Sequence, residues 1–270
     1  MSRTIIITGA SGSMGSAASL ELVKRGWSVV MACRNPEKGE GVRQNIIRAV
    51  PNADITLRKL NLESCRSICS FVESIKSDDI KVDALFNNAG VISRGFSRTE
   101  DGFENTLAVN YIGPFLLTTK LLPVMSGGAS IVNMVSLTCK YGKVEKNFFE
   151  RTDFNRLKTY SDTKLALLLF SIELSRHFPS LNVNVSDPGI VDSNMISMGK
   201  WFDPLADILF RPFCSTPEKG VAPAVRALES NGSLRYFIGK GDKAIPARYL
   251  EHPLLEWLWE ETSRKLESSI

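Results

Sequence analysis

The sequence has few of the residues that build metal sites and disulfide frameworks. Its 270 residues include two histidines, His177 and His252, which stand far apart, and five cysteines that lack paired short spacings. A zinc site needs three or four nitrogen, oxygen or sulfur ligands around one ion, so we expect no metal site. An odd number of cysteines also argues against a disulfide scaffold and favours reduced thiols, as in a cytoplasmic protein.

Long apolar runs and blocks of like charge are also missing. The longest strongly apolar run covers 165–170, whereas a helix needs about 20 residues to span a bilayer. No signal-peptide pattern precedes Ile5. Lys and Arg number 33 against 29 Asp and Glu, and both kinds are scattered. The sequence therefore predicts a soluble, cytoplasmic protein with no membrane span and no basic stripe for nucleic acid.

Short β-rich apolar segments alternate with segments of helical spacing along most of the chain. The expected strands are 4–8, 28–33, 55–60, 83–87, 129–136 and 182–186. This alternation predicts an α/β fold, a doubly wound parallel sheet with helices on both faces, because each parallel connection needs a crossover. Ligands of such sheets bind at the carboxyl ends of the strands.

Two segments break the alternation. Segment 138–159 reads as an extended loop with about one helical turn, and it precedes a strongly apolar helix. Segment 193–216 is amphipathic and contains Pro204 and Pro212. Long excursions over a binding face are often lids, so 193–216 is our candidate substrate lid, with simple surface packing as the alternative.

A glycine-rich stretch, TGASGSMG, follows the first expected strand. A strand, a glycine turn and a helix N-terminus form a pyrophosphate cradle, because the unpaired N–H groups and the helix dipole favour an anion. A tight turn without a ligand is the alternative. The residues expected in the cradle are Gly9, Ser11, Gly12, Ser13, Met14 and Gly15.

Further motifs follow the glycine stretch in order. They are ACRNPEKGE at 32–40, NNAG at 87–90, LAVNYIGPFLLT at 107–118, YSDTK at 160–164 and DPGIVDS at 187–193. Together they resemble the short-chain dehydrogenase/reductase family over about residues 4–195. The resemblance implies one NADP-binding Rossmann domain covering 1–270. ACRNPEKGE and the long spacing from Ser136 to Tyr160 are similar to the retinol-dehydrogenase, protochlorophyllide-reductase and carbonyl-reductase-like subgroup.

The glycine spacing departs from that subgroup's pattern. The usual oxidoreductase branch has TGxxxGxG, whose middle glycine would fall at Ser13. The spacing TGxxGxxG, as here, is more typical of the extended branch that acts on nucleotide sugars. Because a serine can stand near a phosphate and Gly12 restores backbone freedom, we expect an altered cradle that still holds the cofactor.

The resemblance implies a catalytic set of Asn110, Ser136, Tyr160 and Lys164. Tyr160 and Lys164 are four residues apart, which puts them on one helix face. The ammonium, helped by a positive nicotinamide, is expected to lower the tyrosine pKa so that Tyr160 acts as general acid and base. Ser136 would hydrogen-bond the substrate oxygen, Lys164 would bind the nicotinamide ribose, and Asn110 would hold a relay water.

Cofactor choice is expected at the end of the second strand, where Arg34 and Asn35 stand and no carboxylate does. A guanidinium suits a 2′-phosphate, so NADP(H) is favoured over NAD(H), with a solvated surface cation as the alternative for Arg34. The remaining cofactor contacts implied by the resemblance are Asn61, Leu62, Asn88, Ala89, Gly90, Tyr160, Lys164, Pro188, Gly189, Val191 and Ser193.

Taken together, these residues favour an oxidoreductase that transfers a hydride between NADP(H) and a small-molecule carbonyl or alcohol. The apolar residues of segment 193–216 favour a lipophilic substrate. One alternative is an extended-branch nucleotide-sugar epimerase or dehydratase, which fits the glycine spacing but not NNAG. Another is a non-catalytic NADP-binding regulatory protein, against which the complete catalytic set argues.

The helix expected at 160–178 is apolar on more than the one stripe that a sheet would cover. Phe148, Phe149 and Phe154 of the preceding insert are expected to pack on this extra apolar face. We therefore predict a monomer or weak homodimer.

Overall fold

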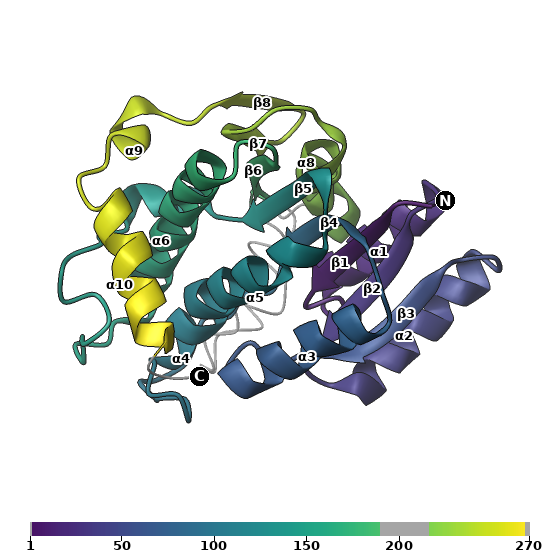
Figure 1. The fold of residues 1–270 in the computed structure, drawn as a ribbon, viewed down its shortest axis with the longest axis horizontal. Coiled ribbons are helices and arrows are strands. Elements are labelled where there is room, and N and C mark those ends of the chain that lie inside the picture. Colours follow the sequence, from purple (N-terminus) through teal and green to yellow (C-terminus); the bar gives the residue numbers. More distant parts are fainter. Residues whose placement is uncertain (1, 190–215, 268–270) are drawn as a thin grey trace, which may run out of the picture.

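A single eight-stranded sheet forms the centre of the computed structural model, which describes residues 2–189 and 216–267 (Figure 1). The strand order is β3-β2-β1-β4-β5-β6-β7-β8, and all neighbours pair in parallel except β7 and β8. The strands are β1 Thr4–Thr8, β2 Ser28–Cys33, β3 Ile55–Lys59, β4 Val82–Asn87, β5 Met125–Met134, β6 Asn182–Asp187, β7 Arg235–Ile238 and β8 Gly241–Ala244.

All six predicted strands are present, with bounds that differ by a few residues. The strands β7 and β8 were not predicted, and their antiparallel pairing corrects the expected all-parallel sheet. Both have only four residues, and every residue of β8 is exposed, so neither carries a long apolar pattern. Together they extend the sheet beyond β6.

Helices cover both faces of the sheet. They are α1 Ser13–Lys24, α2 Pro36–Ala49, α3 Cys65–Ser77, α4 Asn105–Leu107, α5 Gly113–Leu121, α6 Arg156–His177, α8 Pro217–Glu229, α9 Ala247–Leu250 and α10 Leu255–Glu267. Three shorter helical turns are η1 Ala108–Ile112, η2 Leu122–Val124 and η3 Leu137–Tyr141. The helices α1, α2 and α8 enclose one core, and α3, α5, α6 and α10 enclose the other. This doubly wound arrangement confirms the predicted fold class.

One continuous helical stretch, Asn105–Val124, is long and apolar enough to cross a membrane by length and composition alone. The sequence reading did not single it out. Its 18-residue window has a mean hydropathy of 1.3, and 72% of it is buried inside the protein. The stretch runs from α4 to η2 and packs against α3 and α6, so its apolar character is used in the core.

The helix α10 lies against α6 and α5 (Figure 1). The Trp259 ring stacks on Phe170 of α6, with ring centroids 5.9 Å apart, and tilts against Phe115 of α5 at 5.1 Å. On the same helix, Thr262 shares a buried hydrogen bond of 2.7 Å with the Tyr111 hydroxyl. The C-terminal helix therefore covers apolar surface that the sequence reading had given to the insert.

Candidate active site

The glycine stretch forms a tight turn between β1 and α1. Gly12 N–H donates to Gly9 O at 3.0 Å, and α1 begins directly afterwards. A Cβ built on Gly15 would stand 2.4 Å from Gly9 O, so only glycine allows this turn to pack against the helix. The N-terminus of α1 has no side-chain cap and no acidic residue in its first turn. Its free N–H groups suit a pyrophosphate, so the residues present fit a dinucleotide.

The NNAG motif braces this turn from the end of β4. Asn88 Nδ2 donates to Thr8 O at 2.8 Å, and Thr8 Oγ1 accepts from the N–H groups of Asn88 and Ala89, both at 3.0 Å. Asn87 is fully buried and donates to Thr118 and Asn133. In this structure the motif therefore ties β1, β4 and β5 together.

Charged side chains gather where β2 ends. Arg34 Nη1 forms a 2.6 Å ion pair with Glu63, and the Arg34 side chain is 65% exposed. Asn35 caps α2, because its Oδ1 accepts from Lys38 N–H at 2.7 Å. Burial raises the pKa of the Cys33 thiol, while a hydrogen bond with Ser11 and the Lys38 charge act in the opposite direction. Ser11 and Lys38 therefore both lie near Cys33. Since Cys33 directly precedes Arg34, these polar groups gather at the end of β2.

Asn61 and Leu62, two of the expected cofactor contacts, lie just beyond β3. Asn61 Oδ1 accepts from Glu63 N–H at 3.2 Å, and Asn61 N–H donates to Ser67 Oγ at 3.0 Å. Leu62 is buried in the core beneath. Asn61 thus shapes the turn that presents Glu63 to Arg34, so the neighbours of Arg34 include a carboxylate.

Ser136, Tyr160 and Lys164 come together beyond β5. Ser136 precedes η3 directly, and its side chain lies close enough to Tyr160 on α6 to lower the pKa of that tyrosine. Lys164, one turn further along α6, donates from Nζ to Met134 O at 2.7 Å. The Lys164 nitrogen lies 5.7 Å from the centre of the Tyr160 ring. The spacing of four thus brings both side chains to the predicted serine.

Asn110 reaches the same place from η1, a π-helical turn. Its side chain bonds both backbone groups of Val91, accepting from N–H at 2.8 Å and donating to O at 2.9 Å. A Cβ built on Gly90 would stand 3.3 Å from Lys164 Nζ and 3.5 Å from Asn110 Oδ1. All four predicted catalytic residues therefore border one region at the carboxyl ends of β4 and β5.

Burial shifts the pKa values of both Tyr160 and Lys164. Burial raises the pKa of Tyr160 and outweighs the lowering effect of its hydrogen bond with Ser136. Burial also lowers the pKa of Lys164 to about 8. The expected lowering of the Tyr160 pKa depends on a positive nicotinamide as well as on the ammonium, so it stays a prediction. In this structure Lys164 Nζ donates to Met134 O.

A buried carboxylate that the sequence reading did not single out lies beside this pair. Asp187, the last residue of β6, is 1% exposed. It accepts a 2.7 Å hydrogen bond from the Tyr236 hydroxyl on β7 and a 2.8 Å hydrogen bond from Gly189 N–H. Pro188 and Gly189 follow directly. Val191, Ser193 and the candidate lid 193–216 lie outside the described residues, apart from Thr216.

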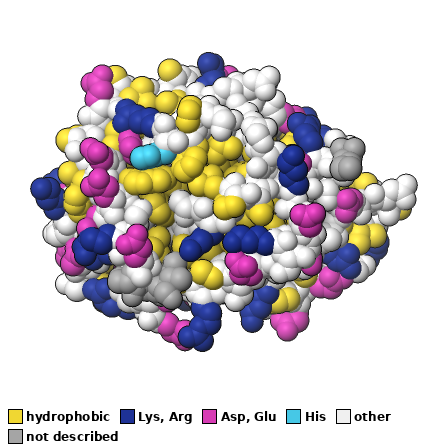
Figure 2. All heavy atoms as spheres, in the orientation of Figure 1, with side chains coloured by type: hydrophobic (Ala, Val, Ile, Leu, Met, Phe, Trp, Pro, Cys, Tyr) yellow, Lys and Arg dark blue, Asp and Glu magenta, His cyan; other side chains and the backbone are white. Residues whose placement is uncertain are grey.

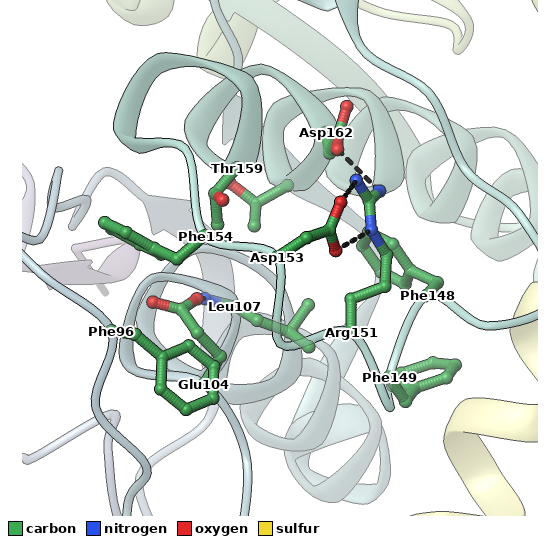
Figure 3. A pocket seen from close by; sticks show the side chains of 11 residues that line it. Phe96, Glu104, Leu107, Phe148, Phe149, Arg151, Asp153, Phe154, Thr159 and Asp162 are labelled. Carbon is green, nitrogen blue, oxygen red and sulfur yellow. Dashed lines mark hydrogen bonds and ion pairs between the residues drawn. The ribbon is translucent and has the colours of Figure 1, made fainter.

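The insert before α6 is fixed by charged groups (Figure 3). Arg151 lies between Asp153 and Asp162, and its Nη1 bonds Asp162 Oδ2 at 2.9 Å. Asp162, within YSDTK, also accepts from Lys143 N–H at 2.7 Å. One buried carboxylate therefore anchors two points of the insert to α6. No sequence pattern paired Asp162 with these partners.

The phenylalanines of the insert turn inward. Phe148 and Phe149 are 6% and 5% exposed, and they join the core cluster that contains the apolar side chains of α6. Their ring partners are Tyr111 and Trp257, from η1 and α10. Phe154 packs edge-to-face on Phe96, outside α6, at 6.5 Å (Figure 3). The first two rings are thus buried as expected, whereas Phe154 contacts a different loop.

Comparisons with known proteins agree with this geometry. The family model of the short chain dehydrogenase matches residues 3–200. Human retinol dehydrogenase 13 is 32% identical over 277 residues, covering 97% of this chain and 84% of the relative. Human retinol dehydrogenase 14 is 30% identical, covering 96% of this chain and 84% of the relative.

Solved structures share the fold. An uncharacterized protein from Mycobacterium Paratuberculosis has a TM-score of 0.77 at 24% identity, covering 98% of this chain and 93% of that one. Salutaridine reductase from Papaver somniferum has a TM-score of 0.66 at 21% identity, covering 87% and 99%. By its family match and its relatives, the chain is an oxidoreductase of the short-chain dehydrogenase family, similar to the retinol dehydrogenases.

Proposed function

We propose that this protein transfers a hydride between NADP(H) and a lipophilic carbonyl or alcohol. One observation carries the proposal: the side chains of Ser136 and Tyr160 lie close together, with Lys164 one helical turn away. A hydroxyl pair beside a buried ammonium suits proton transfer to or from a substrate oxygen.

In the reductive direction, Tyr160 donates its proton to the substrate oxygen as negative charge develops there. Ser136 donates a second hydrogen bond to the same oxygen and orients it. The raised pKa of Tyr160 keeps the hydroxyl protonated, which suits an acid. When bound, the nicotinamide supplies the hydride. Lys164 would hold the nicotinamide ribose, and Asn110 keeps the backbone at Val91 in place.

Preference for NADP(H) is supported by the cations at the end of β2. Arg34 projects into solvent there, and Lys38 lies close enough to Cys33 to affect its thiol. Both suit a 2′-phosphate. The Glu63 carboxylate is paired with Arg34, so a phosphate would replace it as the partner of the guanidinium.

A lipophilic substrate is supported by exposed apolar side chains next to the catalytic set. The large exposed hydrophobic residues of the described chain are Phe96, Leu137, Tyr141 and Leu157. Leu137 directly follows Ser136, and Leu157 lies three residues before Tyr160. Exposed apolar side chains beside a site often mark where an apolar ligand binds.

The proposal keeps a cytoplasmic location, with a small molecule as the partner. The four described cysteines are free thiols, and Cys33, Cys65 and Cys139 are buried. Reduced cysteines suit the cytosol. Cell fractionation of the native protein tests this part, because recovery in the membrane pellet after a salt wash would contradict it.

The experiment is NADPH oxidation, followed by the absorbance of the reduced nicotinamide, across aldehydes and ketones of increasing chain length. We expect turnover that rises with chain length and is lost in Tyr160→Phe. An extended-branch enzyme would instead convert a nucleotide sugar without net NADPH consumption. A regulatory protein would bind NADPH and turn over no carbonyl. Either result would replace the proposal.

A further inference from the structure

The carboxylate of Asp187 is held by partners from two different segments. Oδ2 accepts from the Tyr236 hydroxyl at 2.7 Å, and Oδ1 accepts from Gly189 N–H at 2.8 Å. Tyr236 is 6% exposed and stands on β7, paired in register with Val185 of β6. Two hydrogen bonds to a buried carboxylate fix its position and orientation.

Titratable groups from several elements face this carboxylate. Asp187 alternates along β6 with Val183 and Val185, whose side chains lie in the core that contains α6. Lys164 Nζ reaches Met134 O, and Met134 pairs with Ser186, the residue before Asp187. In agreement with this placement, the charge of Asp187 acts on Lys164, Tyr160 and Cys139. Tyr236 faces it from β7, and Tyr249 of α9 acts on Tyr236 in turn. Lys164 is the cation of this group. Its own hydrogen bond goes to a neutral carbonyl, Met134 O.

We propose that Asp187 is a positioning residue, whose carboxylate is the fixed counter-charge of Lys164 and the anchor of the Pro188–Gly189 turn, held in place by Tyr236. This inference rests on the proposed function of Tyr160 and Lys164. It assigns Asp187 and Tyr236 a role that the sequence motif DPGIVDS did not suggest. The carboxylate contacts the turn directly, by accepting from Gly189 N–H. It affects the proton transfer indirectly, through the charges of Lys164 and Tyr160.

The sign of the effect follows from charge. A buried anion favours the protonated ammonium and disfavours a tyrosinate, so Asp187 raises the pKa values of both Lys164 and Tyr160. Low dielectric in the interior makes this effect stronger than it would be in water. Asp187 thereby keeps Tyr160 in the form that donates a proton, which favours carbonyl reduction.

The first variant is Asp187→Asn. Asparagine keeps a carbonyl oxygen for Gly189 N–H but removes the charge. The rate of carbonyl reduction is measured against pH. We expect the alkaline limb, where reduction declines, to move to lower pH by about half a unit or more. A limb that stays in place would overturn the proposal, because loss of packing alone lowers the rate without moving the limb.

The matched variant is Tyr236→Phe, which keeps the Asp187 charge and removes the hydrogen bond that orients it. We expect the alkaline limb to stay at its wild-type position or move to higher pH, while NADPH binds more weakly through the loosened turn. An acidic shift as large as that of Asp187→Asn would overturn the assignment to charge. This variant also carries the test if Asp187→Asn does not fold.

A second readout needs no activity. The free energy of unfolding of cofactor-free protein is compared with that of Lys164→Met from pH 7 to pH 10, with and without Asp187→Asn. The difference in the free energy of unfolding between the protein with Lys164 and Lys164→Met should rise with pH. We expect this rise to begin at lower pH when the Asp187 carboxylate is gone. An unchanged onset overturns the counter-charge. A shifted onset in a protein inactive toward every carbonyl supports the counter-charge and removes the proposed function instead.

Discussion

Lys164 is fully buried and donates to Met134 O rather than to a carboxylate at hydrogen-bond distance. Burial favours the neutral amine more strongly than the nearby Asp187 charge favours the ammonium, so the pKa of Lys164 falls to about 8. Fixed spacing along α6 brings Lys164 next to Tyr160, but the surroundings decide the charge that each carries. The charge of Lys164 can be measured in the folded protein through the effect of its pKa on stability.

Lys164→Met should change how stability depends on pH. The folded pKa of Lys164, about 8, lies below the ordinary value of 10.5. Between these values the unfolded chain binds more protons than the folded protein. The free energy of unfolding of the wild type therefore rises as pH increases from about 8 to 10.5, and it falls as pH decreases across the same window. Relative to Lys164→Met, the wild type should gain about 3 kcal/mol across this window. Urea unfolding at several pH values checks this, and a flat difference would contradict it.

Tyr160→Phe should lower turnover by a factor of about 10²–10⁴, because it removes the proton donor of the transition state. NADPH affinity should change little, since the hydroxyl acts mainly in the chemical step. Steady-state kinetics and fluorescence titration separate the two effects. If the variant keeps a substantial fraction of wild-type turnover, another group is the acid.

Arg34→Ala should remove most of the preference for NADPH over NADH. If the guanidinium binds the 2′-phosphate, the preference is worth about 1.5–3 kcal/mol, the scale of a charge-assisted hydrogen bond. Glu63→Gln should instead strengthen NADPH binding by about two- to fivefold, because an exposed ion pair competes only weakly with the phosphate. Dissociation constants for both cofactors check this. Equal constants in the wild type would contradict it.

At this scale, sequence reasoning could find residues tied by short spacing and could not find partners across the fold. Tyr160 and Lys164 were predicted from the resemblance of YSDTK to the family motif, and their separation of four placed them on one helix face. Tyr236 and Asp187 are 49 residues apart and meet only because β7 pairs with β6. The pKa directions also depend on burial, which a one-dimensional pattern does not give.

Among the elements, α6 shows how one helix serves two purposes. One face carries Tyr160 and Lys164, and the outer face meets Trp259 of α10, which stacks on both Phe170 and His177. The sequence revealed the surplus apolar surface of α6 but assigned its cover to the nearby insert. The helix α10 was missed because it lies far along the chain from its partner.

Trp259→Ala should destabilise the protein by about 2–3 kcal/mol, because the indole fills the space between α5, α6 and α10. The matched control is Leu157→Ala, whose side chain is 69% exposed and which should change stability by less than about 0.5 kcal/mol. Urea unfolding of both variants checks the contrast. Equal effects would mean that α10 adds little to the fold.

For the molecule as a whole, α10 and the insert cover part of the surface formed by α5 and α6. Figure 2 shows apolar side chains still gathered near α6 on this face, with charged groups around them. Because α10 and the insert already cover part of the α5 and α6 surface, only a limited apolar area is left for association with a second copy of the chain.

We therefore predict a monomer or weak dimer at micromolar concentration. Light scattering checks the mass, and Trp259→Ala should increase association by loosening α10. A stable tetramer in the wild type would contradict this prediction.

The sequence predicted the strands β1–β6 better than the elements of the C-terminal third of the chain. Strands with a short continuous apolar run, such as Thr4–Thr8, were predicted because burial on both faces leaves a clear signal. The exposed strand Gly241–Ala244 has no such signal and depends on its pairing with β7.

The most direct test of hydride transfer uses NADPH that carries deuterium at both C4 positions, together with a long-chain aldehyde. Mass spectrometry of the alcohol product should find one deuterium on the former carbonyl carbon. Tyr160→Phe, with NADPH still bound, should give at most about a hundredth of that product. The account is contradicted if protein that binds NADPH yields no deuterated alcohol from any carbonyl tried, or if Tyr160→Phe yields as much as the wild type.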